Sequence, residues 1–244
     1  LGDIVDGSLG RSYVDDVPVS RKILGVMPFT LELAFAGILV AILIAFPLAI
    51  IAALKRGSAL DHWALVLAML GIAIPNFWLG PLLIHLLCVR MGWLPDPGAG
   101  VLGFETLILP AFVLGTALAG KLTRMIRASV LDVLGSEHVT AARARGLSSK
   151  RVFLKHVLRN SMIPVATVLG LQFAALLTGA IVTEKVFARP GLGTLMLESI
   201  QARDYPMVQG VVIVIAITYI TMNLIVDGMY RMLDPRSKLG TGRI

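Results

Sequence analysis

The chain has 244 residues, of which 57% are hydrophobic and only 15% are charged, and its mean hydropathy is +0.84. A soluble domain carries about 25% charged residues, so this composition excludes an ordinary soluble protein and indicates a polytopic membrane protein. A net charge of +7 would suggest nucleic acid as the partner of a soluble protein, but here a positive-inside bias explains it better. The single cysteine, Cys88, excludes an intramolecular disulfide and a cysteine metal site.

Five apolar blocks are long enough to cross a bilayer as helices, which takes about 20 residues each. They are residues 29–54, 63–89, 106 to about 126, 162–183, and 208 to about 230. Glycine and proline occur within these blocks, as membrane helices tolerate. We therefore predict an all-α polytopic membrane protein with five transmembrane helices in this chain.

The distribution of basic residues between the loops predicts the orientation of these helices. Fifteen Lys and Arg residues fall on one side of the predicted membrane and seven on the other, and the richer side should be cytoplasmic. The N-terminal segment is then extracytoplasmic and the C-terminus cytoplasmic. Because the chain starts outside, and with Leu1 rather than methionine, we expect a further helix upstream and six spans in the intact protein.

This topology divides the chain into three parts. Residues 1–28 form an extracytoplasmic N-terminal segment, residues 29–230 the membrane domain, and residues 231–244 a cytoplasmic tail. Within the membrane domain, residues 128–161 form a basic cytoplasmic loop that separates the third predicted span from the fourth.

The basic loop has the pattern of two short helices with a break between them. Ser136 and Ser148 are placed to cap the two helices, and Gly146 suits the left-handed conformation that ends the first. Ala141 and Ala142 keep the first helix slim, so that it could enter a groove on another protein. In the second helix, basic residues at positions 151, 155 and 159 recur every four residues and predict one basic stripe.

Two other interpretations compete with docking on a protein. The loop could lie on anionic lipid, which explains its charge but not the Ala-Ala pair and the glycine at a fixed offset. A helix-turn-helix that binds DNA also carries glycine in its turn, but tethering between two spans argues against nucleic acid as a partner. We therefore favour a docking element for a cytoplasmic partner.

The stretch AARARGLSSKRVFLKHVLRNSMIPV resembles the cytoplasmic coupling loop of binding-protein-dependent ABC importer permeases. In that family the motif reads Glu-Ala-Ala, three residues, then Gly, whereas this chain has Thr140, Ala141 and Ala142, three residues, then Gly146. This departure resembles the dipeptide/oligopeptide/nickel permease branch. The stretches IPNFWLG, VFARPGLGTLMLESIQARDYPMVQG and NLIVDGMYRMLDPR are similar to further parts of that branch, in the same order along essentially the whole chain.

The resemblance implies a type I ABC importer permease fold in a bacterial inner (plasma) membrane. The chain would form a translocation path for peptides or similar small solutes. Its expected partners are an extracytoplasmic solute-binding protein, a second permease subunit in a heterodimer, two cytoplasmic ATPase subunits and membrane lipid. The coupling residues would be Thr140, Ala141, Ala142, Arg143, Arg145, Gly146 and Arg151. No GxxxxGK[ST] loop occurs, so we expect no cofactor and no enzyme activity in this chain, with ATP hydrolysis in the partner.

Two polar residues inside predicted spans are candidates for the translocation path. Asn76 follows Pro75 and either faces the path or repairs the proline break; Gln172 either lines the path or bonds to a neighbouring helix. Glu32 is either an interfacial acid or a gate residue. The basic residues Lys121, Arg124 and Arg127 either extend to the cytoplasmic surface or contact the coupling loop.

The external segment before the last span predicts a short amphipathic helix over residues 192–202, stopped by Asp204-Tyr205-Pro206. A surface cap on the membrane is the simpler interpretation. The family resemblance makes this segment part of an outer gate and of the binding-protein contact. The candidate gate residues are Pro190, Gly191, Gly193, Asp204 and Tyr205.

Two rival functions remain open at this point. An intramembrane enzyme would need paired carboxylates, a Ser/His pair or a metal cluster at membrane depth, and the mid-span His85 has no evident mate. An ion-coupled secondary transporter would need charges near the midplane. The four histidines share no ligand spacing, so we predict no catalytic residue and no metal site.

Overall fold

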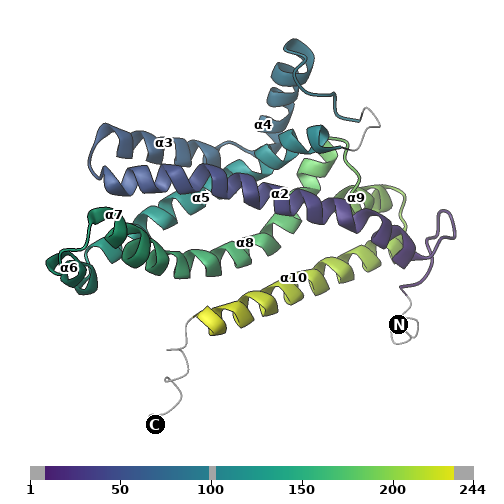
Figure 1. The fold of residues 1–244 in the computed structure, drawn as a ribbon. Helices are drawn as coiled ribbons and strands as arrows, with labels where there is room; N and C mark the ends of the chain where they lie inside the picture. The colour runs from purple at the N-terminus through teal and green to yellow at the C-terminus, as the bar shows by residue number, and fades with distance from the viewer. Residues whose placement is uncertain (1–8, 99–102, 234–244) are drawn as a thin grey trace, which may run out of the picture. The chain divides into compact units, whose positions relative to one another are not determined.

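The structure is a computed structural model that describes residues 9–98 and 103–233. The predicted all-α class is confirmed, because the described residues form helices joined by short turns, with an isolated β-bridge between Arg11 and Pro18. Most of the predicted cytoplasmic tail, residues 234–244, lies outside the described residues. The elements in chain order (Figure 1) are α2 (Val19–Leu54), α3 (Ala59–Ala73), α4 (Asn76–Leu83), the π-helix η1 (Ile84–Arg90), α5 (Phe104–Leu134), α6 (Glu137–Ala144), α7 (Ser149–Val152), the π-helix η2 (Phe153–Leu158), α8 (Arg159–Val186), α9 (Leu192–Gln201) and α10 (Tyr205–Leu233).

Each predicted span coincides with a helical region, but not all of them are simple spans. Counted over the described residues, three helices are long and apolar enough to cross a membrane, namely α2, α5 and α10. A fourth span is obtained if α3 and the α4–η1 helix, which meet at an angle of 99°, are taken together. α8 has 28 residues and covers the fourth predicted block, but it is not among the spans counted in this way.

The break between α3 and α4 has a cause in the sequence. Pro75 has no N–H to donate and takes an extended conformation, with φ −67° and ψ 139°. Proline also disfavours the helical conformation in the residue before it, which is Ile74. The helix therefore stops at Ala73 and restarts at Asn76.

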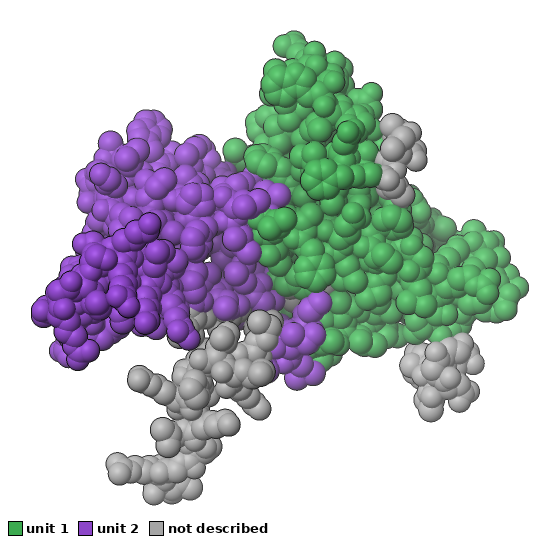
Figure 2. All heavy atoms as spheres, in the orientation of Figure 1, with its two compact units in different colours: residues 1–39, 74–115, 173–221 green, residues 40–73, 116–172, 222–244 purple. Residues whose placement is uncertain are grey.

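The described chain divides into two compact units (Figure 2), and each is considered by itself. Unit 1 comprises Leu1–Leu39, Ile74–Gly115 and Phe173–Thr221. Unit 2 comprises Val40–Ala73, Thr116–Gln172 and Met222–Ile244. The predicted outer segment falls in unit 1 and the basic loop falls in unit 2.

The core of unit 1 has two apolar clusters. One joins the start of α2 to α9 and α10 through Val19, Ile23, Leu192, Met207 and Val211. Close approach of α10 depends on Gly210, because a Cβ at that position would lie 2.4 Å from Cγ1 of Val19. The second cluster packs η1 against α5 and the residues after α8, through Cys88, Leu109, Val113 and Phe187.

Unit 2 packs α3 against α5 through small residues. A Cβ at Gly120 would lie 2.2 Å from the backbone oxygen of Ala68, and one at Gly71 would lie 2.8 Å from that of Thr116. Such close backbone approach is how helices associate in membranes, where apolar side chains gain little by leaving lipid. Both positions therefore require glycine.

An ion pair also joins α3 to α5 in unit 2. Arg127 donates from Nε and Nη2 to the two carboxylate oxygens of Asp61, at 2.7 Å each, and Asp61 also accepts the backbone N–H of Gly57 at 2.9 Å. Asp61 is 3% exposed, and this pairing satisfies its charge. Arg127 thus has a partner in Asp61 that the sequence interpretation did not consider, and its side chain is 21% exposed.

Candidate coupling segment and outer segment

The basic loop folds as two short helical pieces with a turn between them, as predicted. α6 is followed by a turn at Gly146, whose φ of +76° is the left-handed conformation that favours glycine. A Cβ at Gly146 would meet nothing within 4 Å, so the requirement for glycine is conformational. The expected side-chain caps are wrong: Ser136 and Ser148 precede α6 and α7 without capping them, and Ser136 Oγ donates instead to the carbonyl of Val133 at 2.5 Å.

The coupling segment, defined as residues 136–159, has an apolar inner side. The side chains of Val139, Ala142, Val152 and Val157 are buried, with exposed fractions of 0 to 6%. These four buried side chains lie on α6, α7 and η2, which all belong to unit 2. Ala142 is therefore used for packing within the chain, which the sequence interpretation had not anticipated.

The other side of the coupling segment is exposed and basic. The exposed residues among the predicted coupling positions are Thr140, Ala141, Arg143, Arg145, Gly146 and Arg151. Lys155 and Arg159, the other members of the predicted basic stripe, are exposed as well. No ion pair is found for the basic residues of this segment within the part of the chain that the structure describes. This face is thus available to a partner.

Polar contacts tie the coupling segment to its flanking helices. His138 Nε2 lies 3.3 Å from Nδ2 of Asn160 and 3.4 Å from Oγ of Ser136. Ser129 of α5 donates from Oγ to the carbonyl of Ser161 in α8 at 2.8 Å. The first contact joins α6 to the start of α8, and the second joins α5 to α8. No local sequence pattern pairs His138 with Asn160, because Asn160 lies 22 residues further along the chain.

The outer segment, defined as residues 184–207, is organised around a buried carboxylate in unit 1. Glu184 is 0% exposed, and its Oε2 accepts the backbone N–H groups of Gly193 and Thr194, at 2.8 and 3.2 Å, in the first turn of α9. Its Oε1 accepts a hydrogen bond from Oγ1 of Thr30 at 2.6 Å. The first N–H groups of a helix lack partners within the helix and favour negative charge, so Glu184 caps α9 from a distance.

Two predicted gate glycines make this arrangement possible. A Cβ at Gly191 would lie 2.1 Å from Cδ of Glu184, and a Cβ at Gly193 would lie 2.3 Å from Cα of Ile181. The predicted helix over residues 192–202 is confirmed as α9, Leu192–Gln201. The residues Gly191 and Gly193 therefore act by letting α9 lie directly on the end of α8.

Arg189 is also buried in unit 1. It is 4% exposed, and its Nη2 donates to Oε2 of Glu32 at 2.5 Å. Its Nε and Nη1 are buried and have no hydrogen-bond partner among the described residues. Glu32 is therefore half of an ion pair within unit 1, a role that the sequence interpretation did not consider. Pro190, another predicted gate residue, follows directly.

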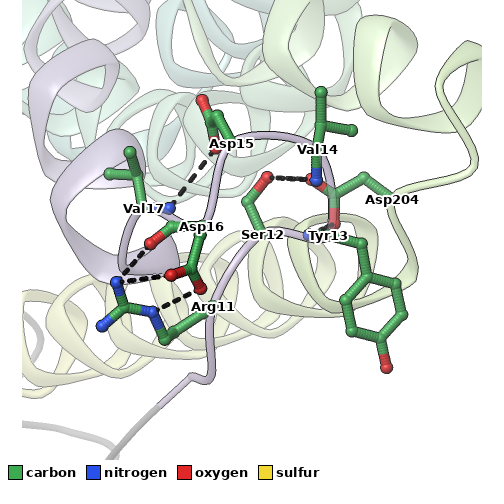
Figure 3. A network of polar contacts seen from close by, with 8 residues as sticks. All are labelled: Arg11, Ser12, Tyr13, Val14, Asp15, Asp16, Val17 and Asp204. Atoms are coloured by element: carbon green, nitrogen blue, oxygen red, sulfur yellow. Dashed lines mark hydrogen bonds and ion pairs between the residues drawn. The ribbon is translucent and has the colours of Figure 1, made fainter.

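Asp204 directly precedes α10 and is 3% exposed (Figure 3). Its Oδ1 accepts the backbone N–H of Tyr13 at 3.1 Å, and its Oδ2 accepts the hydroxyl of Ser12. Oδ1 also accepts the backbone N–H of Met207 at 3.4 Å. Asp204 thus caps α10 and fixes the N-terminal strap, defined as residues 11–18. Tyr205, the other predicted gate residue, is 65% exposed.

The N-terminal strap is a small turn with its own charge pairs. Arg11 donates from Nε to Oδ1 of Asp16 at 2.7 Å, and Lys22 pairs with Asp15 (Figure 3 shows the first pair). The ammonium of Lys22 lowers the pKa of the Asp15 carboxyl below its usual value. These exposed pairs contribute little stability, so the buried carboxylate of Asp204 is the main attachment of the strap.

The two predicted path residues lie in different units. Asn76 is half-buried and opens α4 directly after the break, where the carbonyl of Pro75 accepts the N–H groups of Trp78 and Leu79 at 3.0 Å each. Gln172 is half-buried in α8. Over the residues that the structure describes, no three His, Cys, Asp or Glu side chains gather in a way that could hold a metal ion.

A helical chain with several helices long and apolar enough to cross a membrane belongs to the class of polytopic membrane proteins. Residues 45–239 match the model of the family described as "Binding-protein-dependent transport system inner membrane component". The chain belongs to this family.

Full-length relatives of known role are similar over nearly the whole chain. It is 39% identical to the oligopeptide transport system permease protein AppB of Bacillus subtilis, over 97% of this chain and 78% of that protein. It is 42% identical to the glutathione transport system permease protein GsiC of Escherichia coli, over 96% of this chain and 76% of that protein. It is 38% identical to the dipeptide transport system permease protein DppB of Escherichia coli, over 96% of this chain and 77% of that protein.

Solved structures show the same fold at low identity. The inward-facing MetNI methionine ABC transporter matches with a TM-score of 0.72 at 16% identity, over 87% of this chain and 96% of that chain. An amino acid ABC transporter matches with a TM-score of 0.64 at 16% identity, over 89% of this chain and 94% of that chain. The predicted type I importer permease fold is therefore confirmed.

These findings settle the class of the protein. It is a permease subunit of an ABC importer in the inner membrane, and it is a transport component, not an enzyme. ATP hydrolysis belongs to separate ATPase subunits, and the family requires a solute-binding protein. The two rival interpretations, a secondary transporter and an intramembrane enzyme, are thereby set aside.

Proposed function

We propose that this subunit imports peptides, as one half of a heterodimeric permease whose coupling segment docks on a cytoplasmic ATPase. The names of the three relatives support the solute class, since they are oligopeptide, dipeptide and glutathione permeases. In this proposal the C-terminus and the coupling segment are cytoplasmic, because the loops on that side carry fifteen of the 22 Lys and Arg residues. The upstream helix expected from the sequence stays a prediction.

The observation that carries the docking proposal is the division of the coupling segment into two sides. Val139 and Ala142 anchor α6 to unit 2, while Arg143 and Arg145 are exposed. A rigid, slim and basic helix is suited to a groove with an acidic rim. Movement of the ATPases would then shift α6 as a rigid body, and its polar contacts to α5 and α8 would pass the shift to the membrane helices.

The outer segment would form the extracytoplasmic gate of the same path. Glu184 caps the first turn of α9 and Asp204 caps α10 in unit 1, so α9 would move together with the residues that bind it. Tyr205 is exposed beside it and is a candidate contact for the binding protein. Asn76 and Gln172 remain candidates for the path itself.

The test is co-purification of the importer in detergent from its native membrane, followed by mass spectrometry. We expect an ATPase subunit and a second, different permease to co-purify with the wild-type chain. Reversing two charges, with Arg143→Glu and Arg145→Glu, should lower ATPase recovery about tenfold, because each lost surface pair is worth about 0.5–1 kcal/mol and a tenfold change about 1.4 kcal/mol.

The matched control is Arg90→Glu, a charge reversal at an exposed residue of η1 on the predicted outer side. It should leave ATPase recovery unchanged. Equal loss of the ATPase in both variants would contradict docking through α6. Recovery of the chain as a homodimer would contradict the heterodimer, and uptake of no peptide by the reconstituted importer would contradict the solute class.

A further inference from the structure

Two hollows in unit 1 meet at the same three residues, Ala188, Arg189 and Pro190. The larger has a volume of about 380 Å³ and is lined also by residues of α9 and by Val26 of α2. The smaller has a volume of about 210 Å³ and lies against α5 and the loop after η1. Small-molecule sites begin at about 300 Å³, so the larger hollow can hold a small solute.

Arg189 brings two unsatisfied hydrogen-bond donors to this part of unit 1. Its side chain is 4% exposed, yet only Nη2 has a partner, the carboxylate of Glu32. Nε and Nη1 are buried donors without an acceptor among the described residues. Leaving a buried charged donor unpaired costs about 1–3 kcal/mol or more, so such a group calls for an acceptor that arrives from elsewhere.

The charged residues around the larger hollow define the ligand that fits. Lys185 and Arg189 line it with positive charge, and Glu198 lines it with negative charge. Val26 and Leu195 add apolar surface between them. A small peptide carries a carboxylate at one end, an ammonium at the other and side chains between, and guanidinium groups are well suited to carboxylates.

We propose that the larger hollow is a transient binding site for the C-terminal carboxylate of the imported peptide, with Arg189 and Lys185 as its receptors. Glu198 faces the ammonium end of a short peptide. The proposal rests on the proposed function, since it assigns a site to peptide solutes. Nε and Nη1 of Arg189 have no exposed surface in this structure, so they reach a carboxylate in the hollow only after the side chain turns toward it.

The test compares a peptide that has a free C-terminal carboxylate with its C-terminal amide. The complete importer is reconstituted in liposomes, and peptides of two to five alanines and glutathione are screened to find the best-transported solute. Uptake of that solute and of its amide is then measured with the binding protein saturated by either form. The binding protein is the same in every assay, so a change in the acid-to-amide ratio between variants reports on the permease.

We expect Arg189→Gln to lower the acid-to-amide ratio about tenfold, because a charged hydrogen bond to the carboxylate is lost. The control Arg21→Gln removes an exposed charge of α2 in the same unit and should leave the ratio unchanged. If Arg189→Gln does not assemble, Arg189→Lys keeps the charge and should show a smaller fall of the ratio.

Three results would overturn the proposal. An unchanged ratio, with uptake of acid and amide reduced equally, would show that Arg189 does not bind the carboxylate of the peptide. Failure of both Arg189 variants to assemble would make Arg189 a purely structural residue. Absence of peptide uptake by the wild type would refute the peptide function as well, whereas the first two results leave that function intact.

Discussion

The coupling segment and the outer segment are of similar length, but the first exposes its charged side chains and the second buries several of them. The coupling segment buries small apolar residues such as Val139 and exposes its arginines. The outer segment buries Glu184, Arg189 and Asp204 and satisfies both acids with backbone N–H groups. The comparison suggests that the first is shaped to meet another chain, while the second is shaped to hold its own helix in place.

The largest effect is expected from crowding the buried carboxylate of the outer segment. Gly191→Ala places a Cβ 2.1 Å from Cδ of Glu184, which must displace the cap of α9 and should destabilise the protein by about 3 kcal/mol. The measurement is thermal unfolding of the detergent-solubilised importer. Gly25→Ala in α2, where a Cβ meets nothing within 4 Å, is the control and should cost no stability.

The next effect concerns the attachment of the N-terminal strap. Asp204→Ala removes the acceptor for Ser12 and for the N–H groups of Tyr13 and Met207, and should cost about 2 kcal/mol, as for a lost helix cap. Proteolysis should then cut the strap faster than in the wild type. Asp15→Asn changes an exposed acid of the same strap, and a similar gain in cleavage there would refute the special role of Asp204.

The two adjacent alanines of α6 provide a direct test of its two sides. Ala142→Leu overfills a buried position and should destabilise unit 2 by about 1.5 kcal/mol. Ala141→Leu changes an exposed position and should leave stability unchanged while it lowers recovery of the ATPase subunit. Thermal unfolding and co-purification are measured for both variants, and the same profile in both would contradict the assignment of sides.

The smallest change in stability is expected at Gly146, where the left-handed backbone costs an alanine about 1 kcal/mol. Gly57 is the matched control, since its φ is +77° and a Cβ there also meets nothing within 4 Å. Both alanine variants should lose similar stability. Only Gly146→Ala should reduce the stimulation of ATPase activity by the loaded binding protein, and equal reduction in both would remove Gly146 from the coupling mechanism.

Local patterns in the sequence determined the all-α class, the approximate spans, the two helical pieces around Gly146 and the extent of α9. Each of these depends on residues close together in the chain: an apolar run, a glycine at a helix end, or the stop at Asp204-Tyr205-Pro206. The family resemblance could be read in the same way, because its motifs are continuous stretches. The proline itself indicated the break at Pro75. The angle of 99° between α3 and the α4–η1 helix could not be predicted from the sequence.

Tertiary structure alone decided which polar groups meet. Thr30 and Glu184 are 154 residues apart, Ser12 and Asp204 192 apart, and Asp61 and Arg127 66 apart. No local periodicity encodes such pairs. The cost of burying a charge required that each of these acids have a partner, but only the packing of the helices determined which one, and it also decided that Ala142 faces inward while Ala141 does not.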